Sequence, residues 1–250
     1  MSMLAVRELS KSFGGVRAVE RVSFAVAAGE MLAMIGPNGA GKTTCFNLIN
    51  GQLQPDAGKI LFEDREIQAL PPRERWRLGV GRTFQVAATF GSMTVRENVQ
   101  LAFLSSERRL NSLLSSFAGT SRDKAKKLLE QVGMDAQADR PCAELAYGDL
   151  KRVELALALA ARPRLLLMDE PTSGMAPAER RGLMDLVTAI SRETNLSVLF
   201  TEHDMDVVFG YADRVIVLSE GELIAEGAPA EVRADARVRS VYLGEAAAHA

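Results

Sequence analysis

Nine consecutive residues, 36–44, have the composition of a loop that binds phosphate. Gly36, Gly41, Lys42 and Thr43 occupy the four fixed positions of the pattern G-x-x-x-x-G-K-[ST]. Glycines let the backbone curl until several N–H groups point into one concavity, and a helix that starts there adds partial positive charge. The segment therefore forms an anion site before any side chain contributes.

The side chains of this loop suit the phosphates of a nucleoside triphosphate. Lys42 is expected to reach the β- and γ-phosphates, and the Thr43 hydroxyl to ligate Mg²⁺. The competing interpretation is a glycine-rich turn that contains a lysine by chance. The flanks oppose it, because an apolar strand pattern precedes the loop at 30–35 and helical residues follow at 45–49. The predicted nucleotide-binding residues are Gly36, Pro37, Asn38, Gly39, Ala40, Gly41, Lys42, Thr43 and Thr44.

Two acidic residues, Asp169 and Glu170, follow the apolar run 165–168. Four apolar residues without alternation indicate a strand covered on both faces, as in a parallel sheet, and such sheets place ligands at the carboxyl ends of their strands. We predict that Asp169 holds Mg²⁺, directly or through water, and that Glu170 accepts a proton from an attacking water. Two acids in a strand-end turn are common in isolation, and the phosphate loop is what favours the functional interpretation.

Three further residues have two interpretations each when they are taken alone. His203 follows the strand pattern 196–201 and is either a structural histidine or a hydrogen-bond donor to the γ-phosphate. Gln85, at a predicted strand end, is either an ordinary polar residue or a ligand that holds the metal and the water. Phe13, beside two glycines, is either a packing residue or an aromatic ring that stacks on a nucleotide base.

The elements that must position these residues alternate strands with helices. Residues 4–10 and 22–26 alternate apolar and polar side chains, as half-buried antiparallel strands do. Strand patterns give way to helical spacing between 86 and 162, where Thr94 and Glu97 have the spacing of a capping box. We predict an α/β fold with a mainly parallel core sheet, an antiparallel β subdomain and an inserted helical lobe.

The chain is predicted to form one domain over residues 1–250. Residues 1–85 and 163–250 would form the nucleotide-binding core with the antiparallel subdomain, and residues 86–162 the helical lobe. A helix is expected over 230–243 near the C-terminus.

Composition indicates a cytoplasmic globular protein. The 30 basic residues nearly balance the 32 acidic ones, so nothing indicates bulk binding to nucleic acid or to anionic lipid. The N-terminal residues do not have a signal-peptide profile, and no apolar run approaches the roughly 18 residues needed to cross a bilayer. The two cysteines, Cys45 and Cys142, suit a reducing compartment, and Cys45 is expected to be a packing residue.

Taken together, the motifs resemble those of an ATP-binding-cassette (ABC) ATPase over nearly the whole chain. They are, in order, Phe13, 36–44, Gln85, 145–148, Asp169-Glu170 and His203. The resemblance implies that two cassettes pair head to tail with two ATP molecules between them. It also implies that Phe13 stacks on adenine, that Gln85 couples Mg²⁺ to a transmembrane partner, and that His203 and Lys42 stabilise charge on the γ-phosphate.

In the same family, the motif at 145–148 contacts the ATP held by the other cassette. The residues concerned here are Ala146, Tyr147 and Gly148, and a helix that begins at a glycine is again an anion site. Family members usually have serine at position 146, so Ala146 removes a hydroxyl that would donate across the interface. The loop after Glu170 usually carries an aspartate where this chain has Ala176, which puts communication between the two sites in doubt.

Shorter segments resemble the branched-chain amino acid uptake type, and within it the first of two ATPase subunits. They are Arg82-Thr-Phe-Gln85, Met93-Thr-Val95, Glu202-His-Asp-Met205 and Val241-Tyr-Leu-Gly244. The resemblance implies a second ATPase subunit in a heterodimer, two integral membrane permeases and an extracytoplasmic solute-binding protein, with the chain peripheral on the inner face of the cell membrane. Phe90, Met93 and Val95 are either receptors for a permease helix or core residues of the lobe.

Other functions within and outside this class stay open. Importers of urea and short amides share much of the pattern, so the solute is not specified. An ATPase of lipopolysaccharide export has a similar C-terminal ending, but the segment 82–85 disfavours it. Non-transport ABC proteins of DNA repair or translation usually carry fused second cassettes, coiled coils or basic insertions, and a regulatory module without turnover is expected to lack Glu170.

Overall fold

The computed structural model describes residues 2–83, 89–106 and 120–241, and it confirms the predicted α/β class. A six-stranded sheet with the order β10-β9-β3-β8-β7-β6 forms its centre. The strands are β3 (Met31–Ile35), β6 (Val80–Thr83), β7 (Leu165–Asp169), β8 (Ser197–Thr201), β9 (Arg214–Ser219) and β10 (Glu222–Gly227). All neighbours pair in parallel except β9 and β10, which form an antiparallel hairpin.

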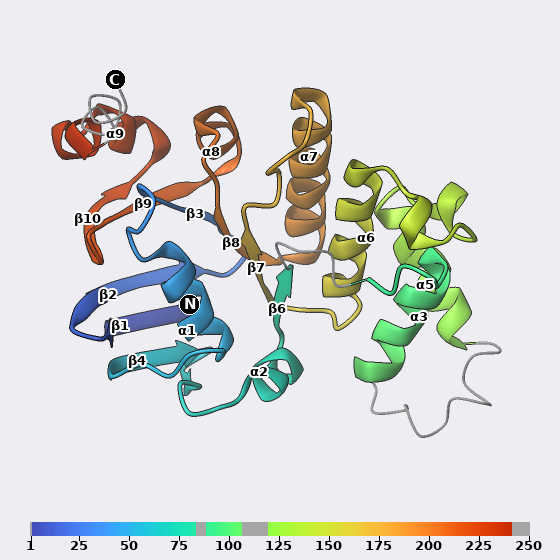
Figure 1. The fold of residues 1–250 in the computed structure, drawn as a ribbon, viewed down its shortest axis with the longest axis horizontal. Helices are drawn as coiled ribbons and strands as arrows, with labels where there is room; N and C mark the ends of the chain where they lie inside the picture. The colour runs from blue at the N-terminus through green and yellow to red at the C-terminus, as the bar shows by residue number, and fades with distance from the viewer. Residues whose placement is uncertain (1, 84–88, 107–119, 242–250) are drawn as a thin grey trace.

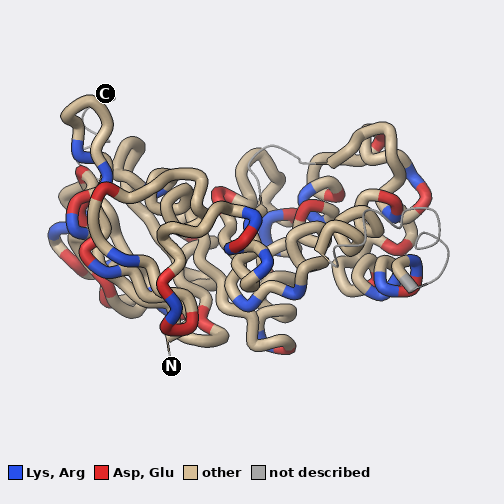
Figure 2. The backbone as a smooth tube through the Cα atoms, turned by 90° about the horizontal axis from the view of Figure 1, so that it is seen from below, with Lys and Arg blue, Asp and Glu red and all other residues tan. Residues whose placement is uncertain are grey.

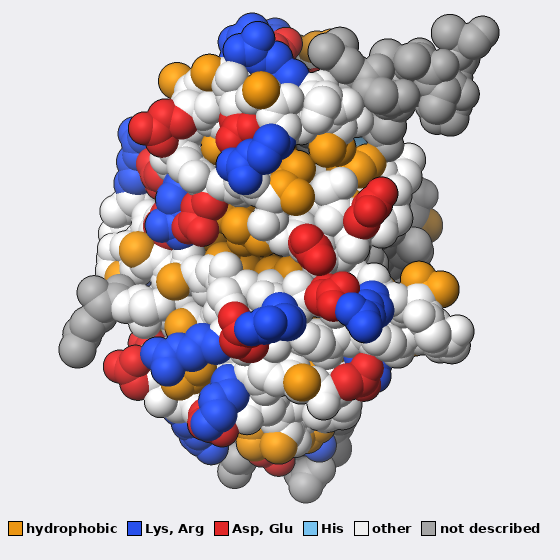
Figure 3. Space-filling view, turned by 90° about the vertical axis from the view of Figure 1, so that its left-hand side faces the viewer, with side chains coloured by type: hydrophobic (Ala, Val, Ile, Leu, Met, Phe, Trp, Pro, Cys, Tyr) orange, Lys and Arg blue, Asp and Glu red, His pale blue; other side chains and the backbone are white. Residues whose placement is uncertain are grey.

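The predicted antiparallel subdomain is a second, four-stranded sheet with the order β2-β1-β4-β5. Its strands are β1 (Ser2–Phe13), β2 (Val16–Ala27), β4 (Ala57–Phe62) and β5 (Arg65–Glu66). It forms one end of the molecule (Figure 1). On that end, charged side chains of both signs surround a strip of apolar side chains (Figure 3).

Helices flank the central sheet and extend the molecule away from the antiparallel end. They are α1 (Lys42–Asn50), α2 (Pro72–Leu78), α3 (Val95–Ser106), α5 (Thr120–Gln131), α6 (Tyr147–Leu159), α7 (Pro177–Thr194), α8 (Met205–Tyr211) and α9 (Pro229–Ala234), with short 3₁₀ turns at Asp135–Gln137 and Cys142–Glu144. None of the helices in the described ranges is long and apolar enough to span a bilayer.

Helices α3, α5 and α6 gather at the end of the molecule opposite the antiparallel sheet (Figure 1). The predicted capping box starts α3, because Thr94 Oγ1 accepts the Glu97 N–H at 3.2 Å and Glu97 Oε2 accepts the Thr94 N–H at 2.8 Å. Apolar side chains of these helices continue into the core beneath the central sheet, and Val153 and Ala156 of α6 are fully buried there. The helices are therefore packed onto the sheet through α6.

Several element boundaries differ from the sequence prediction. The strands predicted over 4–10 and 22–26 are longer, at Ser2–Phe13 and Val16–Ala27. The helix after the motif 145–148 begins at Tyr147, so Gly148 lies in its first turn. The helix predicted over 230–243 is interrupted, since α9 ends at Ala234 and helix resumes at 236–241. Asp235 is extended, and its Oδ1 accepts the Arg237 N–H at 2.7 Å, so this aspartate starts the second helix rather than continuing the first.

Charges of both signs are interspersed along the described backbone (Figure 2). Many of them are paired across short distances at the surface, as Lys11 is with Asp56 at 2.7 Å and Arg96 with Asp139 at 2.8 Å. Such exposed pairs contribute little to stability. The apolar cores on the two sides of the central sheet are the main source of stability.

Candidate functional site

The predicted phosphate loop connects β3 to α1, and its backbone requires glycine at two points. A Cβ atom on Gly36 would lie 2.2 Å from the Leu218 carbonyl oxygen, and one on Gly41 would lie 2.3 Å from the Ala18 carbonyl oxygen. Gly41 also has φ of 99° and is the N-cap of α1, where a side chain would be strained. The fixed glycines of the pattern therefore reflect close packing of the loop against β9 and β2.

Lys42 turns back onto the loop that precedes it. Its Nζ donates to the Gly36 carbonyl at 2.6 Å and to the Pro37 carbonyl at 2.9 Å, and the side chain is buried. The ammonium group thus lies at the mouth of the anion site, whereas Thr43 is exposed in the first turn of α1. Cys45 is a packing residue as predicted, because its side chain is fully buried. The same burial raises the pKa of its thiol to about 12.

Asp169 ends β7 with its carboxylate oriented by two neighbours. Its Oδ1 accepts the Thr201 hydroxyl at 2.8 Å, and its Oδ2 accepts Arg82 at 3.3 Å. Burial lowers the pKa of Arg82, although the nearby Asp169 charge opposes that shift. Arg82 also donates to Asn47 Oδ1 at 2.7 Å and to Gln52 Oε1 at 2.8 Å, so it joins the end of β7 to the end of α1. No sequence signal predicts this role, because Arg82 contacts Asp169 only through the pairing of β6 with β7.

Glu170 and His203 form a direct contact beside Asp169. His203 Nε2 lies 2.8 Å from Glu170 Oε1, and both side chains remain partly open to solvent. Glu170 adopts φ of 49°, an uncommon conformation for a residue other than glycine, and its N–H donates to Thr201 Oγ1 at 3.0 Å. The turn after β7 is thus anchored to β8 while its carboxylate reaches the histidine that follows β8.

These groups share one edge of the central sheet. Strands β3, β8 and β7 are adjacent and parallel, so the phosphate loop, His203 and the Asp169–Glu170 pair all follow their carboxyl ends. Open α/β sheets bind ligands at this edge. The arrangement brings together an anion cradle, an ammonium group, two carboxylates and an imidazole, which is the set of groups that hydrolysis of a phosphoanhydride requires.

The other predicted site residues lie away from this cluster or outside the described ranges. The Phe13 ring is 46% exposed at the turn between β1 and β2, and Lys11 Nζ lies 5.6 Å from its centroid. Ala146, Tyr147 and Gly148 form the N-cap and first turn of α6, with Tyr147 exposed and Gly148 buried. Gln85 lies outside the described residues.

A hollow of about 340 Å³ opens between α2 and α6. Its lining includes Arg73 and Trp76 from α2, Glu154 and Leu157 from α6, and Thr83 at the end of β6. Glu154 Oε1 is buried without a hydrogen-bond partner among the described residues. The hollow thus adjoins the strand that supplies Arg82.

Phe90, Met93 and Val95, the three candidates for a permease contact, differ in burial. Val95 is fully buried with Val99 in the lobe core, so its interpretation as a docking residue is wrong. Met93 is half-buried, and Phe90 is 57% exposed. Apolar residues at similar helical spacing look alike in a sequence, and only packing distinguishes them.

Comparison with known proteins agrees with this geometry. Residues 19–173 match a family model described as ABC transporter, and residues 222–248 match one described as branched-chain amino acid ATP-binding cassette transporter. The high-affinity branched-chain amino acid transport ATP-binding protein LivG of Salmonella typhimurium is 38% identical over 98% of both chains. The lipopolysaccharide export system ATP-binding protein LptB of Escherichia coli is 36% identical, also over 98% of both chains.

A solved structure has the same fold. The crystal structure of an ATP-binding cassette of an ABC transporter in its ADP conformation superposes with a TM-score of 0.86 at 33% identity. The match covers 98% of this chain and 99% of the other. The two-sheet architecture and the helices beside it are therefore those of a nucleotide-binding protein.

Proposed function

This chain belongs to the ABC transporter ATPase family, and we propose that it powers the import of branched-chain amino acids or related small polar solutes by hydrolysing ATP. The observation that supports hydrolysis best is the contact of 2.8 Å between His203 Nε2 and Glu170 Oε1, at the sheet edge that also carries the phosphate loop. The resemblance of residues 222–248 to the branched-chain amino acid cassettes supports the solute class.

Each predicted site residue then has a role that follows from its position. Residues 36–44 cradle the phosphates, and Lys42 is released from the carbonyls of Gly36 and Pro37 to pair with them. Glu170 accepts the proton of the attacking water, and His203 donates to the γ-phosphate. Phe13 is proposed to stack on adenine, since its aromatic ring is exposed and available for stacking.

Mg²⁺ would be held by oxygen atoms from Thr43 and Asp169, with Gln85 as a further proposed ligand. The described residues contain no cluster of three or more histidine, cysteine or acidic side chains that would bind a metal ion by themselves. This fits Mg²⁺ in nucleotide sites, which is bound by one or two side chains together with phosphates and waters. When bound, the ion neutralises charge on the β- and γ-phosphates.

The family of the chain and the exposed N-terminus of α6 support a proposal for its partners. We propose a head-to-tail heterodimer with a second, similar ATPase, in which Ala146, Tyr147 and Gly148 contact the partner's ATP at the N-terminus of α6. Two integral membrane permeases would contact the helical lobe formed by 86–162, and an extracytoplasmic solute-binding protein would deliver the solute. The chain would then be peripheral on the inner face of the cell membrane.

Affinity purification of the full chain from detergent-solubilised membranes tests this function. We expect two permeases and a second ATPase to copurify, and the complex to show ATP turnover stimulated by a solute-loaded binding protein. A chain recovered alone, or with ribosomes or nucleic acid, would contradict the proposal. Stimulation by urea or by short amides, or copurification with lipopolysaccharide-export components, would instead reassign the transported substrate.

A further inference from the structure

Several hydrogen bonds connect the loop that follows Glu170 to the segment around His203. Nearest the sheet, Thr201 Oγ1 donates to Asp169 and accepts the Glu170 N–H. One residue along, Glu202 Oε1 accepts the N–H of Thr172 at 2.8 Å and its hydroxyl at 2.7 Å, and Glu202 is buried. These contacts fix the start of the loop, at 170–172, against the end of β8.

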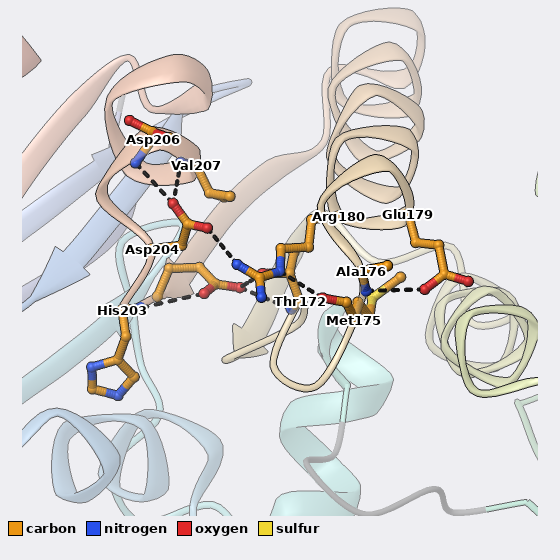
Figure 4. Close-up of polar contacts among 10 residues, drawn as sticks. Thr172, Met175, Ala176, Glu179, Arg180, His203, Asp204, Asp206 and Val207 are labelled. Atoms are coloured by element: carbon orange, nitrogen blue, oxygen red, sulfur yellow. Dashed lines mark hydrogen bonds and ion pairs between the residues drawn. The ribbon is translucent and has the colours of Figure 1, made fainter.

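Arg180, from the first turn of α7, contacts both the far end of the loop and the residue that follows His203. Its Nε donates to the Met175 carbonyl at 2.8 Å, and its Nη1 donates to Asp204 Oδ2 at 2.6 Å. Asp204 in turn caps α8, since its Oδ1 accepts the Asp206 N–H at 3.0 Å. Arg180 therefore lies between the two loops, pointing from α7 towards the start of α8 (Figure 4).

The same loop contacts the motif that begins α6. A Cβ atom built on Gly174 would lie 3.3 Å from Tyr147 Cε1, so the tyrosine ring packs directly on the loop backbone. Ala176, next to Met175, carries no polar side chain, and the N–H of Ala176 is satisfied by Glu179 Oε2 at 3.1 Å. Arg180 is thus the polar side chain that links this part of the loop to the segment of His203.

We propose that Arg180 is a positioning residue for ATP hydrolysis, which holds His203 in register with the loop 171–176 and so conveys the position of Tyr147 to the Glu170–His203 pair. This inference rests on the proposed function, because it assumes that Glu170 and His203 act on ATP. A movement of Tyr147 would displace Gly174 and Met175, and Arg180 would transfer that displacement to Asp204 and to its neighbour His203. The chain would thereby couple its own hydrolytic residues to the helix N-terminus proposed to touch the partner's nucleotide.

The test compares Arg180→Gln with the matched control Arg181→Gln in the purified full complex. Arg181 is the adjacent residue of α7 and is exposed. We expect Arg180→Gln to lower kcat for ATP by between about tenfold and a hundredfold, as misplacement of reacting groups does, without a change in KM or in the ATP dissociation constant. Arg181→Gln should leave all three unchanged.

Two further variants separate positioning from folding. Asp204→Asn should lower kcat as Arg180→Gln does, and the double variant should be no slower than the single ones, because both remove the same link. Arg180→Lys should recover part of kcat, since its ammonium group keeps the charge that pairs with Asp204 but lacks the rigid planar fork that donates in two fixed directions.

The outcomes distinguish this inference from the proposed function. If the wild-type complex hydrolyses ATP and Arg180→Gln matches Arg181→Gln, the positioning role is wrong while the proposed function stands. A fall in kcat accompanied by an equal fold-loss of ATP affinity would also overturn it, because it would mark Arg180 as a residue that only maintains the structure of the nucleotide site. A wild-type complex without ATP turnover would contradict the proposed function itself.

Discussion

At the scale of single residues, the position of Glu170 depends on the pairing of two strands. Because β7 and β8 are adjacent and parallel, the residues that follow them, Glu170 and His203, meet at 2.8 Å. A carboxylate in that place can take a proton from water only if it is ionised and free to turn towards the nucleotide. Neither requirement involves the binding of phosphate, which belongs to the loop 36–44.

Glu170→Gln is therefore expected to separate binding from hydrolysis. The amide keeps the shape of the side chain but cannot accept the proton, so ATP turnover should fall by about 10²–10⁴-fold while ATP affinity stays within about twofold. Steady-state turnover of the purified complex and titration with a fluorescent ATP analogue measure the two quantities. Turnover close to that of the wild type would remove Glu170 from the role of base.

The positions of the phosphate loop and of the acidic pair could be predicted because they depend on local patterns, whereas the catalytic roles of these residues stay predictions. Gly36, Gly41 and Lys42 are fixed by a short pattern whose backbone geometry the structure reproduces, and Asp169 follows its apolar run as expected. Arg82, by contrast, acts on Asp169 across 87 residues of sequence. Such a contact depends on the order of strands in the sheet, which residue types along the chain do not specify.

At the scale of elements, α1 and α2 are joined by a fully buried arginine. The Arg75 guanidinium donates to the carbonyls of Leu48 and Ile49 in the last turn of α1, and to those of Gln68 and Leu70. The last turn of a helix is where carbonyls lack the donors of a following turn, and a positive charge is also favoured there. Burial lowers the pKa of Arg75 to about 10, so the group still carries its charge at neutral pH.

We expect Arg75→Met to destabilise the protein by roughly 2–4 kcal/mol, because several buried carbonyls would lose their donor. The control is Arg73→Met, an exposed position of the same helix, which should change stability by less than about 0.5 kcal/mol. The shift of the denaturant midpoint measures both. Equal midpoints for the two variants would show that the Arg75 hydrogen bonds contribute no net stability.

Asp204, at the start of α8, makes the free energy of unfolding depend on pH. Although partial burial raises the pKa of Asp204, hydrogen bonds from Arg180 and from the N–H groups of Val207 and Asp206 lower it more, so the pKa lies below its ordinary value. A carboxyl group with a lowered pKa in the folded state stabilises the protein above its unfolded pKa of about 3.9. That contribution is lost as pH falls through the folded pKa.

Asp204→Asn should accordingly be less stable than the wild type at neutral pH, and the two should converge below about pH 4. Free energies of unfolding from urea titrations between pH 7 and pH 3 test this. A difference that stays constant across the range would mean that the charge of Asp204 contributes nothing and that only its capping geometry matters.

The prediction of elements failed where local chemistry competes with periodicity. Residues 230–243 have helical spacing, but the Asp235 carboxylate captures the Arg237 N–H and restarts the helix. Similarly, α6 begins within the motif 145–148, at Tyr147, because Ala146 is extended and serves as the N-cap. Caps of this kind depend on side-chain geometry that a sequence pattern leaves open.

At the scale of the whole molecule, the hollow between α2 and α6 lies beside the strand that supplies Arg82, the residue that contacts Asp169. Its lining runs from Trp76 on α2 to Leu157 on α6 and includes Thr83, the last described residue before Gln85. The alternation of strands and helices along the chain was predictable from the apolar patterns. This hollow was not predictable, because it is formed by elements far apart in the sequence. A permease segment seated here would touch the element that carries Arg75 and the strand that carries Arg82.

Substitutions of Leu157 and Leu159 test whether a permease segment binds in this hollow. Both are half-buried leucines of α6, but Leu157 lines the hollow with Trp76, whereas Leu159 lines a separate cavity with Pro163 and Ile190. A lysine at 157 would place a long charged side chain where an apolar side chain now lines the hollow, which costs affinity for a segment packed there. We expect Leu157→Lys to reduce copurification of the permeases at least tenfold, and Leu159→Lys to leave it unchanged, with similar melting temperatures and ATP affinities for both variants. Loss of the permeases from Leu159→Lys but not from Leu157→Lys would place the membrane contact on the opposite side of α6.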